Sequence, residues 1–476
     1  MGKGLVIVHV DGLSADALQR ALDAGLMPFT RRLLDQERYD IHTYRCGVPS
    51  TTPFAQAGIL YGDNSNIPSF RWWDRQRRLA VQFGARSTFK KVADKYFAGT
   101  TPLTKGGACI AACYPAGAKD DFGIAYHERT YGEDERSRSA WRVVLPYLLN
   151  PVHLGDWAGH AALSIGRTAA EYASTVTSGH RPAAPYVVSD ALEEVFVHHL
   201  TRYAVEQAMR ERFAPIYAGF YAYDEVGHAF GPDDSHSERM LRHVDRTVHA
   251  IARARGDAYE LLVLSDHGQV PAARFDHLTG ASLGELVARW MPGFHVEELN
   301  GKKVGPPAAQ AKGAVKLSFS GGLGHVYLSD NDWRLTADEV SARYPALLSG
   351  LLGCEHIALV MARRGDEDVF WTRGRELSVS ALAEVLARYD EPVILREQLH
   401  RLNRFETAGD LVLFGAFIRD RQVNFENQLG GHGSIGGEQL HPFMLARREW
   451  ELDTSHVRGA HELHPMLSAL RDRLSA

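Results

Sequence analysis

The run Leu5-Val-Ile-Val-His-Val10, followed at once by Asp11, decides the fold class of this chain. A short and almost continuous apolar run of this kind is typical of a strand that is buried on both faces of a parallel sheet. A helix is expected next, with Ser14 as its N-cap and Gly25 as its stop. The chain therefore begins with the strand, loop and helix of an α/β fold.

Two further apolar runs also lead into acidic residues. The run from Pro215 to Tyr223 is predicted to be a second buried strand, and it leads into Asp224-Glu-Val-Gly-His228. The run from Glu260 to Ser265 is predicted to be a third, and it leads into Asp266-His267-Gly268. Because ligands bind outside the carboxyl ends of the strands in open α/β sheets, we expect these acids and Asp11 to meet at one edge.

Three carboxylates at one edge repel one another and are costly to bury unless cations lie between them. His228 and His267 follow two of these acids at short range, and His432 lies in the glycine-rich loop Gly430–Gly437, whose backbone can bend to a required geometry. Carboxylates and imidazoles without a thiolate suit two divalent cations, zinc first, with manganese or iron as alternatives. We interpret the set as a metal site rather than as polar groups satisfied inside a core.

The stretch from Cys46 to Gly62 predicts a loop that breaks into a helix. Thr52 is expected at the N-cap, Pro53 at the first helical position and Gly62 at the stop. A hydroxyl at a helix N-terminus faces unpaired N–H groups and the positive end of the helix dipole. By itself this pattern favours a simple capping residue. Beside two metal ions about 4 Å apart, which can ionise an alcohol and bridge a phosphoryl group, Thr52 becomes a candidate nucleophile.

The rest of the chain is predicted to belong to one catalytic domain, 1–476, with two inserted regions. Residues 63–185 are irregular and are expected to cap the sheet without joining it, and 275–405 form the second insertion. The further elements that we expect are a helical piece near Trp141–Leu149, an amphipathic helix over Ser189–Arg212, a helix opened by the capping box Ser235-x-x-Glu238, strands within Val315–Leu328 (broken at Gly321-Gly322) and Ile357–Trp371, a helix over Ser378–Tyr389, a buried strand over Gly409–Ile418 and a C-terminal helix over His464–Leu474.

The order of these motifs resembles the alkaline phosphatase superfamily, and within it the type I phosphodiesterase/nucleotide pyrophosphatase branch. The resemblance spans nearly the whole chain and rests on Tyr-Asp-Glu-Val-Gly-His-x-x-Gly-Pro from Tyr223, Ser-Asp-His-Gly from Ser265 and Gly-His-Gly around His432. It implies a three-layer α/β sandwich with a central, mostly parallel sheet and inserted caps. It also implies that one metal is held by Asp224, His228 and His432, and the other by Asp11, Asp266, His267 and the nucleophile Thr52.

The resemblance also guides the choice among Cys46, Ser50, Thr51 and Thr52 as the nucleophile. Sulfatases of the superfamily use a modified cysteine in Cys-x-Pro-Ser-Arg, but here Gly-Val-Pro-Ser follows Cys46 and no arginine comes next. In the family the nucleophile lies ten positions before the glycine that ends its helix, which is Thr52 when counted back from Gly62. The implied reaction passes through a covalent phosphothreonine that water then hydrolyses.

Substrate contacts are expected from Phe54, Arg71, Trp72 and Trp73. The diesterase branch usually carries an asparagine some twenty positions after the nucleophile, and here that region reads Arg71-Trp72-Trp73. An arginine can supply the same attraction for a phosphoryl oxygen. The aromatic side chains would suit a flat or apolar ester group, although they could equally pack a cap against the core.

Composition narrows the functional classes further. The 476 residues carry a net charge of −5, and the pI is near 6.5, so a nucleic-acid-binding surface is not expected. Four scattered cysteines do not make a disulfide scaffold, and no apolar run has the length of a membrane span. The chain as it stands is expected to be cytoplasmic, although many relatives of the resembled family are exported. The oligomeric state is left open.

The leading hypothesis is therefore a two-metal phosphoesterase that hydrolyses a small-molecule phosphodiester or pyrophosphate. A phosphomonoesterase or a phosphonate hydrolase on the same scaffold is the alternative among enzymes. A metal-stabilised binding module is the non-catalytic alternative, but a structural metal closes its coordination shell and needs no spare hydroxyl.

Overall fold

The computed structural model describes residues 2–82, 88–122, 140–151, 154–155, 157–159, 162, 165–166 and 197–476. Within this part of the chain the central sheet has seven strands in the order β2-β21-β8-β1-β7-β5-β6. From β8 to β6 the strands run parallel, whereas β21 is antiparallel to both of its neighbours. The strands are β1 (Gly4–Val10), β2 (Tyr39–Thr43), β5 (Ala108–Ile110), β6 (Asp120–Phe122), β7 (Ile216–Phe220), β8 (Tyr259–Leu264) and β21 (Phe443–Arg447).

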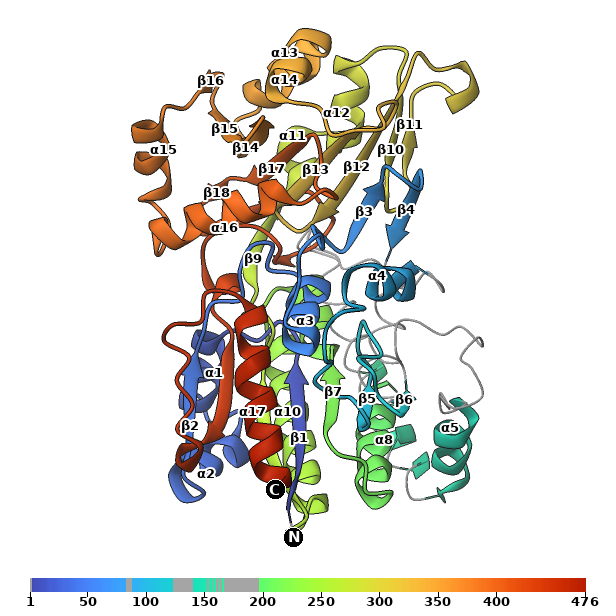
Figure 1. Ribbon diagram of the computed structural model, residues 1–476, viewed down its shortest axis with the longest axis vertical. Helices are drawn as coiled ribbons and strands as arrows, with labels where there is room; N and C mark the ends of the chain where they lie inside the picture. Colours follow the sequence, from blue (N-terminus) through green and yellow to red (C-terminus); the bar gives the residue numbers. More distant parts are fainter. Residues whose placement is uncertain are drawn as a thin grey trace.

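Helices cover both faces of this sheet, which makes the three layers that the sequence predicts (Figure 1). The alternation of side chains along β1 shows why: Leu5 and Ile7 belong to one apolar cluster, and Val6 and Val8 belong to the other. The first cluster includes α3 (Thr52–Tyr61) and α17 (Leu463–Ser475). The second includes α1 (Ala15–Asp23), α2 (Pro28–Gln36), α5 (Ala140–Leu149), α8 (His198–Arg210), α9 (Ala222–Phe230) and α10 (Ser235–Ala254).

A second sheet of eight strands lies above the central one, at the top of Figure 1. Its order is β11-β10-β12-β13-β17-β14-β15-β16, and only the β10–β12 pair is parallel among the pairs in the described residues. Its strands are β10 (His295–Glu298), β11 (Lys303–Val304), β12 (Ala314–Ser320), β13 (Leu323–Leu328), β14 (Ile357–Arg364), β15 (Glu367–Thr372), β16 (Arg375–Glu376) and β17 (Leu411–Gly415). Its helices are α11 (Phe275–Thr279), α12 (Leu283–Trp290), α13 (Ala337–Arg343), α14 (Pro345–Gly353), α15 (Val379–Leu386) and α16 (Pro392–Arg404).

Smaller elements join the two sheets. A four-stranded sheet is formed in the order β18-β19-β9-β20, and β9 follows directly after the Ser-Asp-His-Gly motif. Its strands are β9 (Val270–Arg274), β18 (Phe417–Ile418), β19 (Arg421–Asn424) and β20 (Gly430–Gly431), and the remaining elements are the hairpin β3 (Arg71–Asp74) and β4 (Leu79–Gln82) and the helix α4 (Thr88–Tyr96). The glycine-rich loop that contains His432 is thereby brought from the second sheet to the edge of the first.

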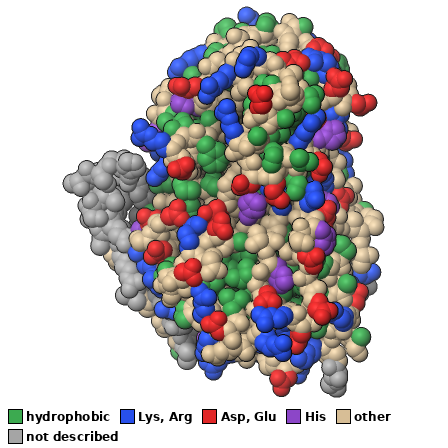
Figure 2. Space-filling model, turned by 90° about the vertical axis from the view of Figure 1, so that its left-hand side faces the viewer, with side chains coloured by type: hydrophobic (Ala, Val, Ile, Leu, Met, Phe, Trp, Pro, Cys, Tyr) green, Lys and Arg blue, Asp and Glu red, His purple; other side chains and the backbone are tan. Residues whose placement is uncertain are grey.

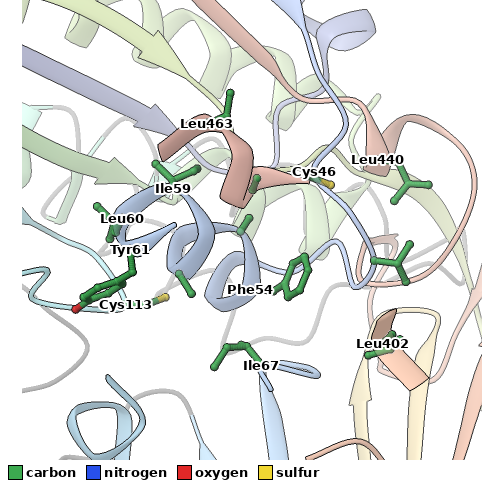
Figure 3. Close-up of a cluster of buried hydrophobic side chains, with 14 of the residues drawn as sticks. Cys46, Phe54, Ile59, Leu60, Tyr61, Ile67, Cys113, Leu402, Leu440 and Leu463 are labelled. Carbon is green, nitrogen blue, oxygen red and sulfur yellow. The ribbon is translucent and has the colours of Figure 1, made fainter. Parts of the chain in front are cut away.

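The apolar cluster around α3 connects both halves of the molecule. Phe54, Ile59, Leu60 and Tyr61 project from this helix toward different neighbours, among them Leu463 of α17 (Figure 3). The same cluster contains residues of the second sheet and of α16. A helix buried on every side in this way is held firmly, so its N-terminal residue has a fixed position at the sheet edge.

Two expectations about the central sheet are wrong. The region 63–185 contributes β5 and β6, which extend the sheet beyond β7, so it does not lie wholly outside the sheet. These strands have three residues each, too few to show a clear periodicity. The second buried strand ends at Phe220 and not at Tyr223, and α9 begins at Ala222, so Asp224 lies in the first turn of a helix.

The start of α10 differs from the expected one by a single residue. The N-cap of α10 is Asp234, whose side chain accepts the N–H of His236, so Ser235 and Glu238 do not form the expected capping box. The helix expected over Ser189–Arg212 is present as α8 from His198, and residues 189–196 lie outside the described residues. The strands expected within Val315–Leu328 and Ile357–Trp371 are confirmed, and each range forms an antiparallel pair of strands. The helices expected near 141–149, 378–389 and 464–474 are confirmed as well.

The surface agrees with the modest net charge. Figure 2 shows Lys and Arg side chains intermingled with Asp and Glu side chains over the face that it presents. Searching the helices in the described ranges finds none with the length and apolar character that crossing a membrane requires.

Candidate active site

The N-terminus of α3 lies at the carboxyl edge of the central sheet. Its N-cap is Thr51, and Thr52 is the first helical residue, so the helix begins one residue earlier than expected. Both threonines have the same capping propensity, so the sequence alone does not separate them. Gly62 ends the helix in the left-handed conformation, with φ of 72°, as expected.

Only Thr52 among the candidate nucleophiles lines the cavity that opens at this edge. The Ser50 hydroxyl lies 3.2 Å from Gln439 Oε1 and accepts the Gly433 N–H, so it is used in holding the glycine-rich loop. Burial raises the pKa of the Cys46 thiol, which keeps it protonated. Thr51 is fully buried. Of the four residues, Thr52 is therefore the one placed to meet a molecule in the cavity.

The first group of metal-ligating side chains comprises Asp224, His228 and His432. Asp224 and His228 are four residues apart on α9, hence on one face of the helix, and His228 Nε2 lies 3.0 Å from Asp224 Oδ2. His432 comes from the glycine-rich loop, and its Nε2 lies 3.6 Å from the same oxygen.

Backbone carbonyls set the tautomers of both histidines. His228 Nδ1 lies 3.0 Å from the Gly430 carbonyl oxygen, and His432 Nδ1 lies 2.8 Å from the Ser50 carbonyl oxygen. A carbonyl only accepts, so each Nδ1 carries the proton and each neutral ring presents a bare Nε2. The two Nε2 atoms are 3.2 Å apart and share Asp224 Oδ2 as a neighbour, so three electron-pair donors converge on one point, as a metal site requires.

The second set of expected ligands, Asp11, Asp266, His267 and Thr52, lies beside the first. Asp11 and His267 also have ligand atoms close enough to Asp224 to share an ion with it. His267 Nδ1 faces the carbonyl oxygen of Gly268 at 3.1 Å, so its Nε2 is also bare. This Nε2 lies 3.3 Å from Asp11 Oδ1, 3.5 Å from Asp266 Oδ2 and 3.1 Å from Thr52 Oγ1. Thr52 Oγ1 is also 3.4 Å from each Asp11 oxygen.

The electrostatics show that this arrangement calls for cations. Burial and the charges of Asp266 and Asp224 raise the pKa of Asp11 well above its ordinary value. Burial lowers the pKa of His267 to about 4, so this ring is neutral and available as a ligand. Burial alone would lower the pKa of His228, but the Asp224 carboxylate outweighs it and raises that pKa to about 10. A proton on His228 thus occupies the place of a cation, and a metal ion would displace it.

Two supporting side chains were missed in the sequence. Gln269 Nε2 donates to the Asp224 carbonyl oxygen at 2.8 Å and to Asp224 Oδ1. The other carboxylate oxygen, Oδ2, therefore faces His228 and His432. Gly227 permits this contact, because a Cβ there would lie 2.2 Å from Gln269 Oε1. His9 Nε2 lies 3.0 Å from Asp266 Oδ1. His9 precedes Asp11 by two residues on a strand, so the period of two could have placed both on one face.

The cavity beside these groups has a volume of about 370 Å³. Phe70, Arg71 and Tyr221 line it together with Thr52 and ligands of both groups. Arg71 Nη1 lies 3.1 Å from Glu426 Oε1, and Glu426 Oε2 accepts the Gly321 N–H at 2.9 Å, so the guanidinium is held at the cavity wall.

The aromatic side chains expected at the substrate lie elsewhere. Trp72 and Phe54 are 1% exposed and belong to the core cluster around α3, where Phe54 packs near Phe405. Trp73 is half-buried, with the Lys316 ammonium over its ring. None of these three side chains is among the described residues that line the cavity, whereas Arg71 is.

This architecture, with acidic and imidazole side chains that could hold metal ions and a helix-terminal threonine at the sheet edge, is typical of metal-dependent hydrolases of the alkaline phosphatase type. The sequence profile of the family described as "Type I phosphodiesterase / nucleotide pyrophosphatase" matches residues 5–291, which is more than half of the chain. The chain belongs to this family and is a phosphoesterase. No curated protein sequence matches it at a significant level.

Solved structures share the fold at low sequence identity. Phosphonoacetate hydrolase from Sinorhizobium meliloti 1021, in complex with phosphonoformate, is similar with a TM-score of 0.52 and 16% identity over 98% of this chain and 96% of that one. Human ectonucleotide pyrophosphatase/phosphodiesterase 5 has a TM-score of 0.53 and 12% identity over 99% and 95% of the two chains. The murine protein, an inactive variant in complex with AMP, has a TM-score of 0.51 and 12% identity over the same shares.

Proposed function

We propose that this phosphoesterase uses two divalent metal ions, zinc first, to hydrolyse a small-molecule phosphodiester or pyrophosphate through a phosphothreonine at Thr52. The observation that carries the proposal is the position of Thr52 Oγ1, 3.1 Å from the bare Nε2 of His267 and on the wall of the cavity. A hydroxyl placed there is exposed to substrate and surrounded by ligands. Such a position suits a nucleophile better than a helix cap, and Thr51 occupies the cap.

The donor set supports a division into two sites. Asp224, His228 and His432 would hold one ion, and Asp11, Asp266, His267 and Thr52 the other. When bound, such ions supply the positive charge that ionises an alcohol at neutral pH and stabilises a leaving oxygen.

The chain's own groups prepare each chemical step. Thr52 Oγ1 has the carboxylate of Asp11 at 3.4 Å and His267 at 3.1 Å, so its proton faces acceptors. Thr52 Oγ1 forms a bond to phosphorus as the bond from phosphorus to the ester oxygen breaks, and the Thr52 proton passes through water to the departing oxygen. A water molecule then attacks phosphorus, the bond from phosphorus to Oγ1 breaks, and a proton of that water restores the Thr52 hydroxyl.

The far wall of the cavity supports a substrate with a second group beyond the reacting phosphoryl. Arg71 and Phe70 follow one another in the chain and both line the cavity, which extends to Tyr221. The Arg71 guanidinium suits a phosphoryl or second phosphate oxygen, and the rings suit an apolar or flat substituent. A diester or pyrophosphate could contact both the candidate metal ligands and the far wall of the cavity. A simple monoester could contact only the candidate metal ligands.

Rates on paired nitrophenyl substrates test this proposal. The zinc-loaded protein should hydrolyse bis(nitrophenyl) phosphate faster than nitrophenyl phosphate, and a chelator should abolish turnover before the fold is lost. Thr52→Ala is the matched variant and should lack activity while it retains the wild-type melting temperature. A protein that is faster on the monoester would contradict the diester assignment, and turnover that survives metal removal would contradict the metal chemistry.

A further inference from the structure

A chain of buried contacts runs from the loop after β5 to the ligand Asp266. The Cys113 N–H donates to Gln56 Oε1 at 2.7 Å. The amide nitrogen of Gln56 donates to Tyr221 Oη at 2.9 Å and lies 3.3 Å from His9 Nδ1. His9 Nε2 lies 3.0 Å from Asp266 Oδ1. Both Gln56 and His9 have an exposed fraction of 0%, so water does not substitute for these partners.

The Cys113 contact fixes the orientation of the Gln56 amide. A backbone N–H can only donate, so the atom of Gln56 that faces it must be the oxygen, and the NH₂ group therefore points to His9. An NH₂ group only donates, so His9 Nδ1 is the acceptor. In the neutral ring the proton then lies on Nε2, the atom that faces Asp266.

The two oxygens of Asp266 consequently have different surroundings. Oδ1 receives the His267 N–H at 2.9 Å and has His9 Nε2 at 3.0 Å, a close approach that is not aligned as a hydrogen bond. Oδ2 is buried and has no hydrogen-bond partner within the described ranges, and it lies 3.5 Å from the bare Nε2 of His267. A buried carboxylate oxygen without a donor is costly unless a cation meets it.

We propose that His9, with its tautomer set by Gln56, is a positioning residue that occupies Asp266 Oδ1 and directs Oδ2 to the metal. This inference rests on the proposed two-metal function and adds a residue to it. His9, Asp11 and Asp266 also have ligand atoms close enough to share an ion, so His9 as a direct ligand is the competing account. The protonated Nε2 argues against that account, because a nitrogen that carries a proton has no electron pair for a metal.

Zinc affinity measured by chelator competition on purified protein tests the proposal. His9→Leu should lower the affinity for one of the two zinc ions by roughly 10- to 100-fold, which is the usual effect of losing a residue that supports a metal ligand. The affinity for the other zinc ion should not change. His9→Gln keeps an N–H donor near the position of Nε2 and should restore the affinity to within about threefold of wild type. Loss in His9→Gln as large as in His9→Leu, or wild-type affinity in His9→Leu, would overturn the proposal.

The visible spectrum of the cobalt-loaded protein separates positioning from ligation. A positioning residue leaves the ligand set intact, so the bands of His9→Gln should match those of wild type. A band shift that reports a lost nitrogen ligand would overturn the proposal in favour of direct ligation. If His9→Leu does not fold, Gln56→Met removes the donor to Nδ1 and should weaken the same zinc equivalent, and an unchanged affinity in that variant would also overturn the proposal.

His325→Gln is the matched control for replacing a buried histidine. His325 is 0% exposed and is held by the Pro68 carbonyl oxygen and the Gly409 N–H, in the second sheet. Its replacement should lower the melting temperature without changing zinc affinity. Failure of the two-metal function would appear as wild-type protein that binds no zinc, whereas failure of this inference alone would appear as wild-type zinc binding in His9→Leu.

Discussion

His228 and His432 present their Nε2 atoms to each other at 3.2 Å, although they lie on a helix and on a glycine-rich loop more than two hundred positions apart. Their Nδ1 protons are held by two carbonyl oxygens, so neither ring can donate to the other in its neutral form. Two bare nitrogens beside a carboxylate oxygen are favourable only with a cation between them.

His432→Ala should remove one metal ion and leave the other. The reason is that the ligand nitrogen of His432 faces the Asp224 carboxylate. Its ring also stacks on His267, with the ring centroids 3.9 Å apart, but Asp11, Asp266 and His267 keep their contacts with one another without it. Elemental analysis of the metal-replete protein should give about two ions per chain for wild type and about one for the variant. One ion in replete wild type, or two in the variant, would contradict the assignment.

The pH dependence of the metal-free protein follows from the raised pKa of His228. This pKa rises from 6.5 to about 10 in the folded protein, against the effect of burial, because of Asp224. A pKa that is higher in the folded state stabilises the fold fully below 6.5, and the contribution is lost as the pH rises through about 10. The melting temperature of metal-free wild type should therefore fall toward that of His228→Gln across this range. A difference between the two proteins that does not change with pH would contradict the pairing.

Gly227→Ala should damage the Asp224 site through Gln269. The added Cβ would lie 2.2 Å from Gln269 Oε1, so the amide must move and release Asp224 Oδ1. We expect a loss of about 1–3 kcal/mol in unfolding free energy, measured by denaturant titration, together with weaker zinc binding at that site. Gly353→Ala is the matched control, because it is also a helical glycine and a Cβ there meets nothing within 4 Å. Equal effects of the two substitutions would contradict the steric argument.

Arg71→Met should affect diesters more than monoesters. Its guanidinium is held at the cavity wall by an ion pair with Glu426. Arg71 lines the same cavity as the candidate metal ligands, although it is distant from most of them in sequence. Loss of one charge-assisted contact should raise KM for a diester roughly tenfold, equivalent to about 1.4 kcal/mol. The comparison is Trp73→Ala, at a residue two strand positions after Arg71 that does not line the cavity, and it should leave the ratio of the two KM values unchanged. If Trp73→Ala changed that ratio and Arg71→Met did not, the tryptophan and not the arginine would be the residue that contacts the diester.

The candidate metal ligands were predictable because their signal is local. Asp11 and Asp266 follow continuous apolar strands, and His432 lies in a loop of glycines, so each is a polar residue where a strand or loop meets the sheet edge. The family resemblance added the pairing of ligands. The strands β8, β1 and β7, which are neighbours in the central sheet, were also predictable, because each is a continuous apolar run.

The remaining features depend on contacts between distant segments. Gln56 and Gln269 are ordinary polar residues in sequence, and only packing against Cys113 and Asp224 gives them roles. β5 is too short for a periodicity, and β21 joins the sheet as an antiparallel strand near the end of the chain. The sequence does not show whether Trp72 contacts the substrate or packs in the core. Its side chain is buried in the structure, which places it in the core.

The central claim is that Thr52 becomes phosphorylated during turnover. Acid quenching of the zinc-loaded protein during hydrolysis of a nitrophenyl diester, followed by peptide mass spectrometry, tests it directly. The account predicts one substituted phosphoryl group on the peptide that contains Thr52, present in wild type and in Thr51→Ala and absent from Thr52→Ala. A phosphoryl group on Ser50 or Thr51, or steady turnover by Thr52→Ala, would contradict it.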